Sequence, residues 1–139
     1  MKSRIGTTWS AWEPRLRSVL RIVAAFMFIL SGTSKLFAFP VPMPHGGVAH
    51  APSEVWFAGV LEVVGGGLLL LGLFTRPVAF LLAGEMAVAY FQVHFPKAFW
   101  PTVNGGVNAV LYCFIWLYFS AAGPGPWSLD AARGRRLRI

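Results

Sequence analysis

The chain has 139 residues, of which 56% are hydrophobic and 12% are charged. A typical soluble domain carries about 25% charged residues, so the composition indicates a membrane protein with no room for a separate soluble catalytic domain. The net charge of +7 comes from basic residues that flank apolar runs, which favours a lipid bilayer as partner over nucleic acid. The single cysteine, Cys113, excludes an intramolecular disulfide and a dithiol centre.

The order of polar and apolar segments predicts the fold. Residues 1–17 are polar and basic and are expected to form an amphipathic lead-in at the lipid headgroups. Four apolar runs follow, at residues 19–39, 54–74, 78–95 and 106–121, and a helix of about 20 residues crosses the roughly 30 Å of hydrocarbon. The sequence therefore predicts an all-α membrane protein, with a four-transmembrane-helix antiparallel bundle over residues 18–122 and a basic tail over residues 123–139.

Basic residues predict the orientation of the bundle. They gather in the N-terminal segment, in the turn at Arg76 and in the C-terminal tail, whereas the two opposite loops contain only Lys97. Because short loops rich in Lys and Arg stay in the cytoplasm, both termini are predicted to be cytoplasmic. Arg21 is then expected to lie at the inner edge of the first span and to extend its guanidinium to the headgroups.

Ionisable side chains lie inside the apolar runs and mark a candidate ligand-binding site. Such a residue costs at least a few kcal/mol in hydrocarbon unless it is paired, neutral or in contact with water. The antiparallel order places Lys35 and Glu62 at depths that permit an ion pair in the outer half of the bundle, with Glu85 nearer the midplane. The predicted polar cluster comprises Lys35, Glu62, Glu85, Gln92, His94, Asn104, Asn108 and Tyr112.

Structural roles are the alternative for several of these residues. Lys35 and Glu62 can simply hold two spans together, and Asn104 and Asn108 flank a Gly-Gly pair and can cap the fourth span. His94 can be an interfacial residue at a helix end. The loop residues His45 and His50 do not form a convincing ligand set, so no metal site is predicted.

Several segments, in this order and spacing, resemble the DoxX family of small four-span membrane proteins over roughly residues 15–130. The segments are residues 32–36 (GTSKL), Glu62 with Gly65 and Gly66, residues 72–79 (GLFTRPVA), residues 94–106 (HFPKAFWPTVNGG), residues 111–114 (LYCF) and residues 123–130 (GPGPWSLD). Relatives often carry a glutamate directly after the Asn-Gly-Gly, where this chain has Val107. If that carboxylate belongs to the family's site, the site of this chain either differs from the family's or depends on Glu62 and Glu85 instead.

The resemblance implies an inner (plasma) membrane protein with several spans that is linked to redox processes. Some relatives are described as membrane subunits of quinone-linked oxidoreductases, and others as partners of enzymes in thiol and oxidant defence. The first hypothesis is therefore a redox-associated subunit that binds a quinone at the polar cluster and receives electrons from a partner enzyme. A stand-alone enzyme is not favoured, and no catalytic residue or covalently bound cofactor is predicted.

Two other functions remain open. The same polar residues suit a non-catalytic scaffold that anchors partner proteins in the membrane. They also suit a small transporter or proton path through Glu62 and Glu85, which would need a homo-oligomer because four spans are few for a transporter.

Overall fold

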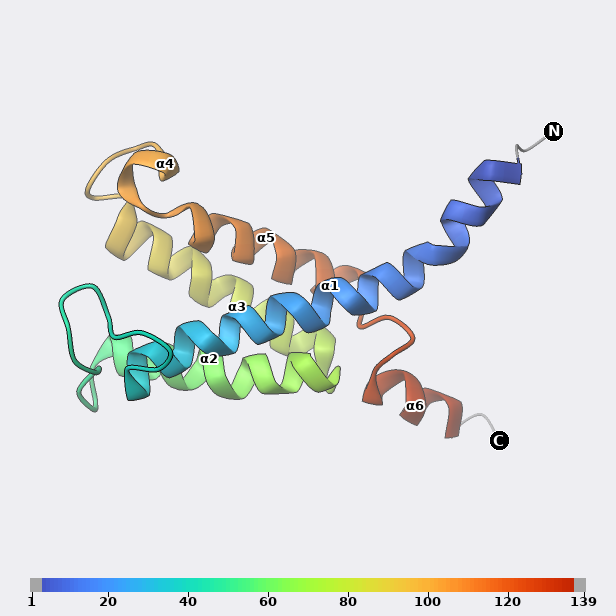
Figure 1. Ribbon diagram of the computed structural model, residues 1–139, viewed down its shortest axis with the longest axis horizontal. Coiled ribbons are helices and arrows are strands. Elements are labelled where there is room, and N and C mark those ends of the chain that lie inside the picture. The colour runs from blue at the N-terminus through green and yellow to red at the C-terminus, as the bar shows by residue number, and fades with distance from the viewer. Residues whose placement is uncertain (1–3, 137–139) are drawn as a thin grey trace.

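Helices follow one another along the described chain, residues 4–136, in the computed structural model, and those residues contain no β-strand (Figure 1). Side chains are described for residues 8–134. The elements are α1 (Arg4–Phe37), α2 (Glu54–Leu71), α3 (Thr75–Ala89), a π-helical segment η1 (Tyr90–His94), α4 (Pro101–Asn104), α5 (Val107–Ala122) and α6 (Leu129–Arg136). The prediction of an all-helical fold is confirmed.

The first helix is longer than the predicted span. Residues 4–17, expected as a separate lead-in, continue directly into the apolar part as one helix of 34 residues with Pro14 inside it. Ser18 donates a hydrogen bond to the carbonyl of Pro14, and Arg17 pairs with Glu13 one turn earlier. These contacts lie around and after Pro14, whereas the backbone hydrogen bond that proline lacks would run back to the carbonyl one turn before it.

Local signals end and start the other helices. The Oγ of Ser53 accepts a hydrogen bond from the backbone N–H of Trp56 at 3.2 Å, which caps the start of α2. Gly72 ends α2 with φ of 67°, in the left-handed region that glycine tolerates. The chain then turns within three residues into α3, so the two helices are adjacent and antiparallel.

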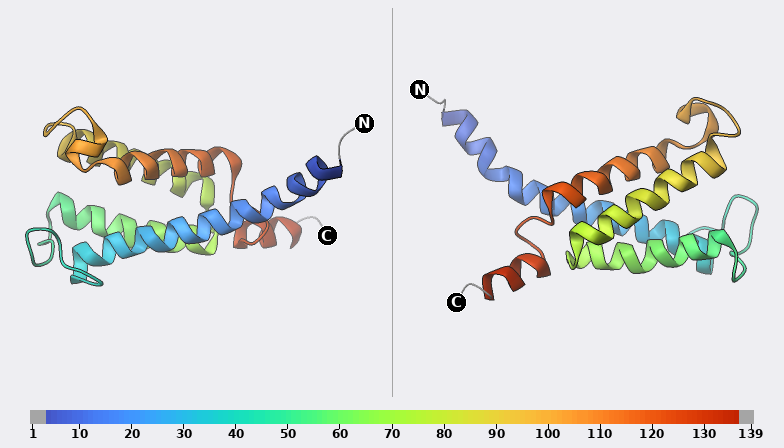
Figure 2. Two further views of the ribbon diagram at one scale, coloured as in Figure 1. Left: turned by 45° about the horizontal axis from the view of Figure 1, so that its top comes forward. Right: turned by 180° about the vertical axis from the view of Figure 1, so that it is seen from behind.

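Two helix pairs make up the body of the molecule. Helix α1 packs along α2, helix α3 packs along α5, and a smaller contact joins α2 to α3. We call the end of the molecule that holds residues 72–75 and 123–128 the tail end. The opposite end, which holds the loops 38–53 and 95–106, is the loop end. The two pairs diverge from the tail end toward the loop end (Figures 1 and 2). Both ends of the described chain lie on the side of the tail end (Figure 1).

Glycines allow α1 and α2 to approach closely. A Cβ on Gly32 would lie 2.8 Å from the carbonyl oxygen of Gly59, and one on Gly66 would lie 2.8 Å from the side chain of Ile29. Small residues of this kind permit close packing of helices in membranes. Between the pairs, Phe28 of α1 contacts the rings of Tyr112 and Trp116 of α5 at centroid distances of 5.0 and 5.3 Å.

Among the described residues, two helices are long and apolar enough to cross a membrane: Thr8–Phe37 within α1, and α2. Helix α5 is equally apolar but shorter. Large apolar side chains also face outward on the second pair, where Phe80 of α3 and Phe114 of α5 are each 67% exposed. The surface is therefore suited to lipid on both pairs.

Arg21 holds the tail end together from inside. It is fully buried, and its guanidinium donates hydrogen bonds to the carbonyls of Leu69 (2.5 Å) and Leu70 (2.8 Å) at the end of α2. It also donates to the carbonyls of Pro124 (2.9 Å) and Trp127 in the segment after α5. The prediction that Arg21 extends to the headgroups is wrong, because these carbonyls satisfy the guanidinium within the protein.

Two further arginines bind the last carbonyls of α5. Arg17 of α1 donates to the carbonyl of Ala122 at 2.9 Å, and Arg76 of α3 donates to the carbonyls of Ser120 (3.2 Å) and Ala121. The C-terminal end of a helix carries unpaired carbonyls and a partial negative charge, so cations are stabilising there. Arg17, Arg21 and Arg76 thus have the same role: each donates hydrogen bonds to the carbonyls at the end of a neighbouring helix.

Candidate functional site

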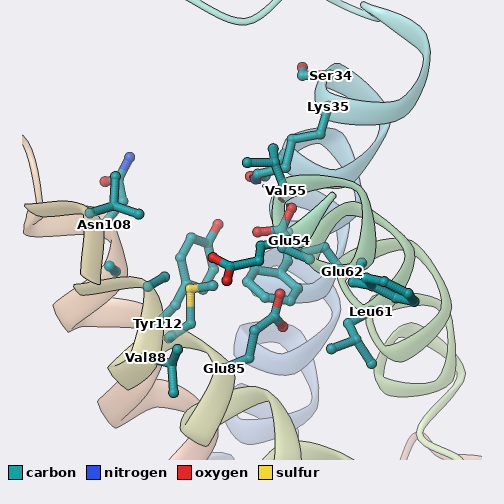
Figure 3. A pocket seen from close by; sticks show the side chains of 18 of the residues that line it. Ser34, Lys35, Glu54, Val55, Leu61, Glu62, Glu85, Val88, Asn108 and Tyr112 are labelled. Carbon is teal, nitrogen blue, oxygen red and sulfur yellow. Dashed lines mark hydrogen bonds and ion pairs between the residues drawn. The ribbon is translucent and has the colours of Figure 1, made fainter. Parts of the chain in front are cut away.

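A cavity of about 1370 Å³ lies between the two helix pairs. Side chains of α1, α2, α3, η1 and α5 line it, and most of them are apolar (Figure 3). Seven of the eight residues of the predicted cluster line it, so the divergence of the pairs creates a space where polar residues from both pairs meet. The lining members of the cluster are Lys35, Glu62, Glu85, Gln92, His94, Asn108 and Tyr112.

Lys35 and Glu62 form an ion pair on one wall of the cavity. The Nζ of Lys35 lies 2.6 Å from the Oε2 of Glu62 and donates a second hydrogen bond to the Oγ of Ser31 at 2.8 Å. The close approach of α1 and α2 at Gly32 and Gly59 brings the two side chains within reach of each other. The ion pair predicted from the depths of the two residues is confirmed.

Glu85 lies on the other wall, on α3, and has a different environment. Both carboxyl oxygens are buried, and neither has a hydrogen-bond partner among the described residues. Its side chain lines the cavity with those of Glu62 and Tyr112 (Figure 3). A buried polar group without a partner is uncommon in proteins and often marks a place where a ligand or water completes the bonding.

Tyr112 and Asn108 add polar groups from α5, one turn apart. The ring of Tyr112 is held between those of Phe28 and Trp116, with centroid distances of 5.0 and 5.8 Å. Its position is therefore fixed by packing, whereas Asn108 is exposed toward the cavity.

The remaining cluster residues divide into two groups. Gln92 and His94 lie on η1 and reach the cavity, and the Nδ1 of His94 is 3.1 Å from the carbonyl oxygen of Asn104. Asn104 does not line the cavity. Its amide donates to the carbonyl of Ala98 at 2.8 Å and accepts from the backbone N–H of Gly106 at 2.7 Å, so it organises the loop before α5. This role is structural, but it is not the predicted helix cap, because α5 begins after Gly106 without a side-chain cap.

Three polar residues of the cavity, Ser31, Ser34 and Glu54, were not in the predicted cluster. Ser31 precedes Lys35 by one helical turn, and this i, i+4 spacing was the signal that linked the two side chains. Glu54, in the first turn of α2, also lines the cavity and adds a third carboxyl group. Across the described part of the chain, no three His, Cys, Asp or Glu side chains come together as metal ligands.

The cavity thus combines a long apolar lining with hydrogen-bonding groups of several kinds. Lys35 and Glu62 already satisfy each other, whereas Glu85 and the exposed Asn108 have bonding capacity left. A ligand with an apolar body and a small polar head matches this distribution, because the polar groups then fix its orientation.

Comparison with known proteins places the chain in a family. The sequence profile of the DoxX family matches residues 16–95, more than half of the chain, and this region contains Lys35, Glu62 and Glu85. The chain is 47% identical over 122 residues to an uncharacterized protein of Haemophilus influenzae, across 86% of this chain and 91% of that protein. It is 26% identical over 132 residues to an uncharacterized membrane protein of Mycobacterium tuberculosis, across 84% of this chain and 80% of that protein. No solved structure matches the chain. The protein is a membrane protein that belongs to the DoxX family.

Proposed function

We propose that the protein is a four-span inner-membrane protein that binds a quinone between its two helix pairs and serves as the membrane subunit of a redox system. The observation that carries the proposal is the cavity of about 1370 Å³, which is apolar along most of its lining and polar at Lys35, Glu62, Glu85 and Tyr112. A quinone has the complementary chemistry: two carbonyl oxygens on a ring, followed by an isoprenoid chain that dissolves in the bilayer.

Helix lengths and charges support four spans with both termini in the cytoplasm. The 15 residues of α3 and the five of η1 follow each other directly and cover roughly 30 Å. The 16 residues of α5 cover about 24 Å, and the short helix α4 precedes them. Arg76 and Arg133 lie toward the tail end, and Lys97 lies in a loop at the loop end, which fits a cytoplasmic tail end.

The orientation can be tested by labelling single cysteines. In a Cys113→Ser background, Lys97→Cys and Arg133→Cys are treated in intact cells with a maleimide that does not cross membranes. We expect labelling at position 97 alone, and labelling at position 133 only after the membrane is opened. Labelling of both positions in intact cells would contradict four spans with the tail in the cytoplasm.

Electrons have to come from a partner enzyme in this proposal. The chain has one cysteine and three histidines, and His94 alone among the histidines lies on a predicted span. It therefore offers neither a dithiol nor two axial histidines on facing spans. Its own contribution is to bind and orient the quinone within reach of the partner.

Mass spectrometry of bound lipids tests the proposal. Protein purified in mild detergent is extracted with organic solvent, beside the variant Lys35→Ala/Glu62→Ala and the control Phe114→Leu, which changes an outward-facing side chain. We expect about one quinone per protein in the unaltered chain and in the control, and a large loss in the double variant. A protein that holds no quinone, and takes none up when quinone is added, would refute the proposal.

Projecting surfaces at the tail end support a second candidate function, that of a scaffold for partner proteins. The N-terminal part of α1 extends beyond the helix pairs (Figure 1), and Trp9 there is 71% exposed. Trp9→Ala with Trp12→Ala is expected to reduce cross-linking to partner proteins in native membranes if this candidate holds, while quinone content stays unchanged. Cross-linking that does not depend on these residues would count against it.

A further inference from the structure

We propose that Glu85 selects the headgroup of the ligand: it keeps its proton and donates a hydrogen bond to an uncharged acceptor oxygen. The cavity then takes neutral amphiphiles, such as a quinone with its carbonyl oxygens, in preference to cationic ones. This inference rests on the proposed function and assigns the contact that recognises the ligand.

The surroundings of Glu85 do not support an ionised carboxylate. Both oxygens are buried, and neither receives a hydrogen bond from the described residues. A charged carboxylate in an apolar setting needs a cation or several donors to replace its lost hydration, and a group that lacks both is stable in its neutral form.

The cation nearest to this region is already engaged. The ammonium of Lys35 contacts the Oε2 of Glu62 at 2.6 Å and the Oγ of Ser31 at 2.8 Å. Its charge is therefore balanced by Glu62, on the same wall. An ionised Glu85 would add a further negative charge to a cavity that already contains the carboxyl groups of Glu62 and Glu54, and it would repel the carboxylate of Glu62.

A neutral Glu85 carries an O–H that finds no acceptor within the described part of the chain. Such a buried donor gains a hydrogen bond when a ligand oxygen arrives, and no existing bond has to break for the carboxyl group to turn toward it. Tyr112 on α5 lines the same cavity, so the headgroup lies beside Glu85 and Tyr112, on the face of the α3–α5 pair that looks toward α1 and α2, while the apolar body extends along the lining.

Binding of two matched probes tests which head the cavity accepts. Decylubiquinone and decyltriphenylphosphonium are titrated into the purified protein, its Glu85→Gln variant and its Glu85→Leu variant. Glutamine still donates a hydrogen bond but cannot become anionic, so Glu85→Gln is expected to bind the quinone with nearly unchanged affinity. Leucine removes the donor, so Glu85→Leu is expected to weaken quinone binding by about tenfold.

Two results would overturn the inference while leaving quinone binding intact. One is equal quinone affinity in all three proteins, because Glu85 would then make no contact with the head. The other is preferential binding of the phosphonium by the unaltered chain, lost in Glu85→Gln, because Glu85 would then act as an anion. A chain that binds no quinone at all refutes the proposed function instead.

Infrared spectroscopy reads the proton directly and does not depend on the probes. The carbonyl stretch of a protonated carboxylic acid is expected in the unliganded protein, and its loss in Glu85→Gln assigns it to this residue. Decylubiquinone is expected to shift the band to lower frequency as the O–H begins to donate. Absence of the band from the unliganded protein would overturn the inference, whatever the ligand.

Discussion

Lys35 and Glu62 are joined by an ion pair whose two members are unequally buried. The side chain of Glu62 is 3% exposed, whereas that of Lys35 is 24% exposed. The buried carboxylate of Glu62 therefore relies on the ammonium of Lys35 to balance its charge. The ammonium is partly exposed and can turn toward water or headgroups instead. This asymmetry gives different expectations for the two single substitutions.

Lys35→Met is expected to lower the free energy of unfolding by about 3 kcal/mol, because it leaves a buried carboxylate without its cation. Glu62→Gln is expected to cost less, because Lys35 can turn toward water or headgroups. Thermal unfolding in detergent, followed by circular dichroism, measures both. The double variant Lys35→Met/Glu62→Leu should be close to the unaltered protein in stability, and equal losses in the two single variants would contradict the asymmetry.

Arg21→Lys is expected to destabilise the tail end by about 3 kcal/mol, because a lysine ammonium cannot reach the four carbonyls that the guanidinium binds. The segment over residues 123–128 should then be cut more rapidly by proteinase K. Arg15→Lys is the matched control, since Arg15 is exposed and contacts the ring of Trp12. Unchanged protease resistance in Arg21→Lys would show that the segment is held by other contacts.

Gly32→Ala and Gly67→Ala are expected to act in opposite directions. The new methyl at position 32 would lie 2.8 Å from the carbonyl oxygen of Gly59, so α1 and α2 must move apart at a cost of about 1–3 kcal/mol. A methyl at position 67 meets nothing within 4 Å, and alanine favours the helix by roughly 0.5–1 kcal/mol. Unfolding midpoints measured side by side decide the signs; stabilisation by both would mean that the helices are not in close contact at Gly32.

Asp130 caps α3 from a distance in the sequence. Its carboxylate accepts hydrogen bonds from the backbone N–H groups of Phe74 and Thr75, each at 2.9 Å. Asp130→Ala is expected to cost about 1–2 kcal/mol, as the loss of a helix cap does, and to speed hydrogen exchange at these two amides. Asp130→Asn, which keeps an acceptor oxygen, should exchange at an intermediate rate; no change at either amide would refute the cap.

The sequence predicts the ion pair of the cavity because helix geometry and the cost of buried charge are strong, local rules. Lys35 and Glu62 lie at matching depths on antiparallel spans, and few other groups are available to either of them. The same rules place Glu85 deep in the third apolar run. They do not reveal that its carboxyl group finds no hydrogen-bond partner among residues 8–134, because that depends on which side chains fill the space between α3 and its neighbours.

Arg21 and Asn104 show where the prediction from sequence ends. The partners of Arg21 are backbone carbonyls in α2 and beyond α5, and carbonyls have no signature in the sequence. Asn104 has a polar side chain near the outer end of a span, as a ligand-binding residue would, but its bonds are local to the loop before α5. In both cases the hydrogen-bond partners, which the sequence does not show, decide the role of the side chain.

The two helix pairs are joined at the tail end and diverge from it. Arg17 ties α1 to the end of α5 there, and Ser18 receives a hydrogen bond from the backbone N–H of Trp127. Toward the loop end the cavity separates the pairs, so a small rotation of one pair about the tail end becomes a larger displacement at the loops. The tail end is therefore the more firmly tied end of the molecule, and the cavity can widen or narrow at the loop end while the hydrogen bonds of the arginines stay in place.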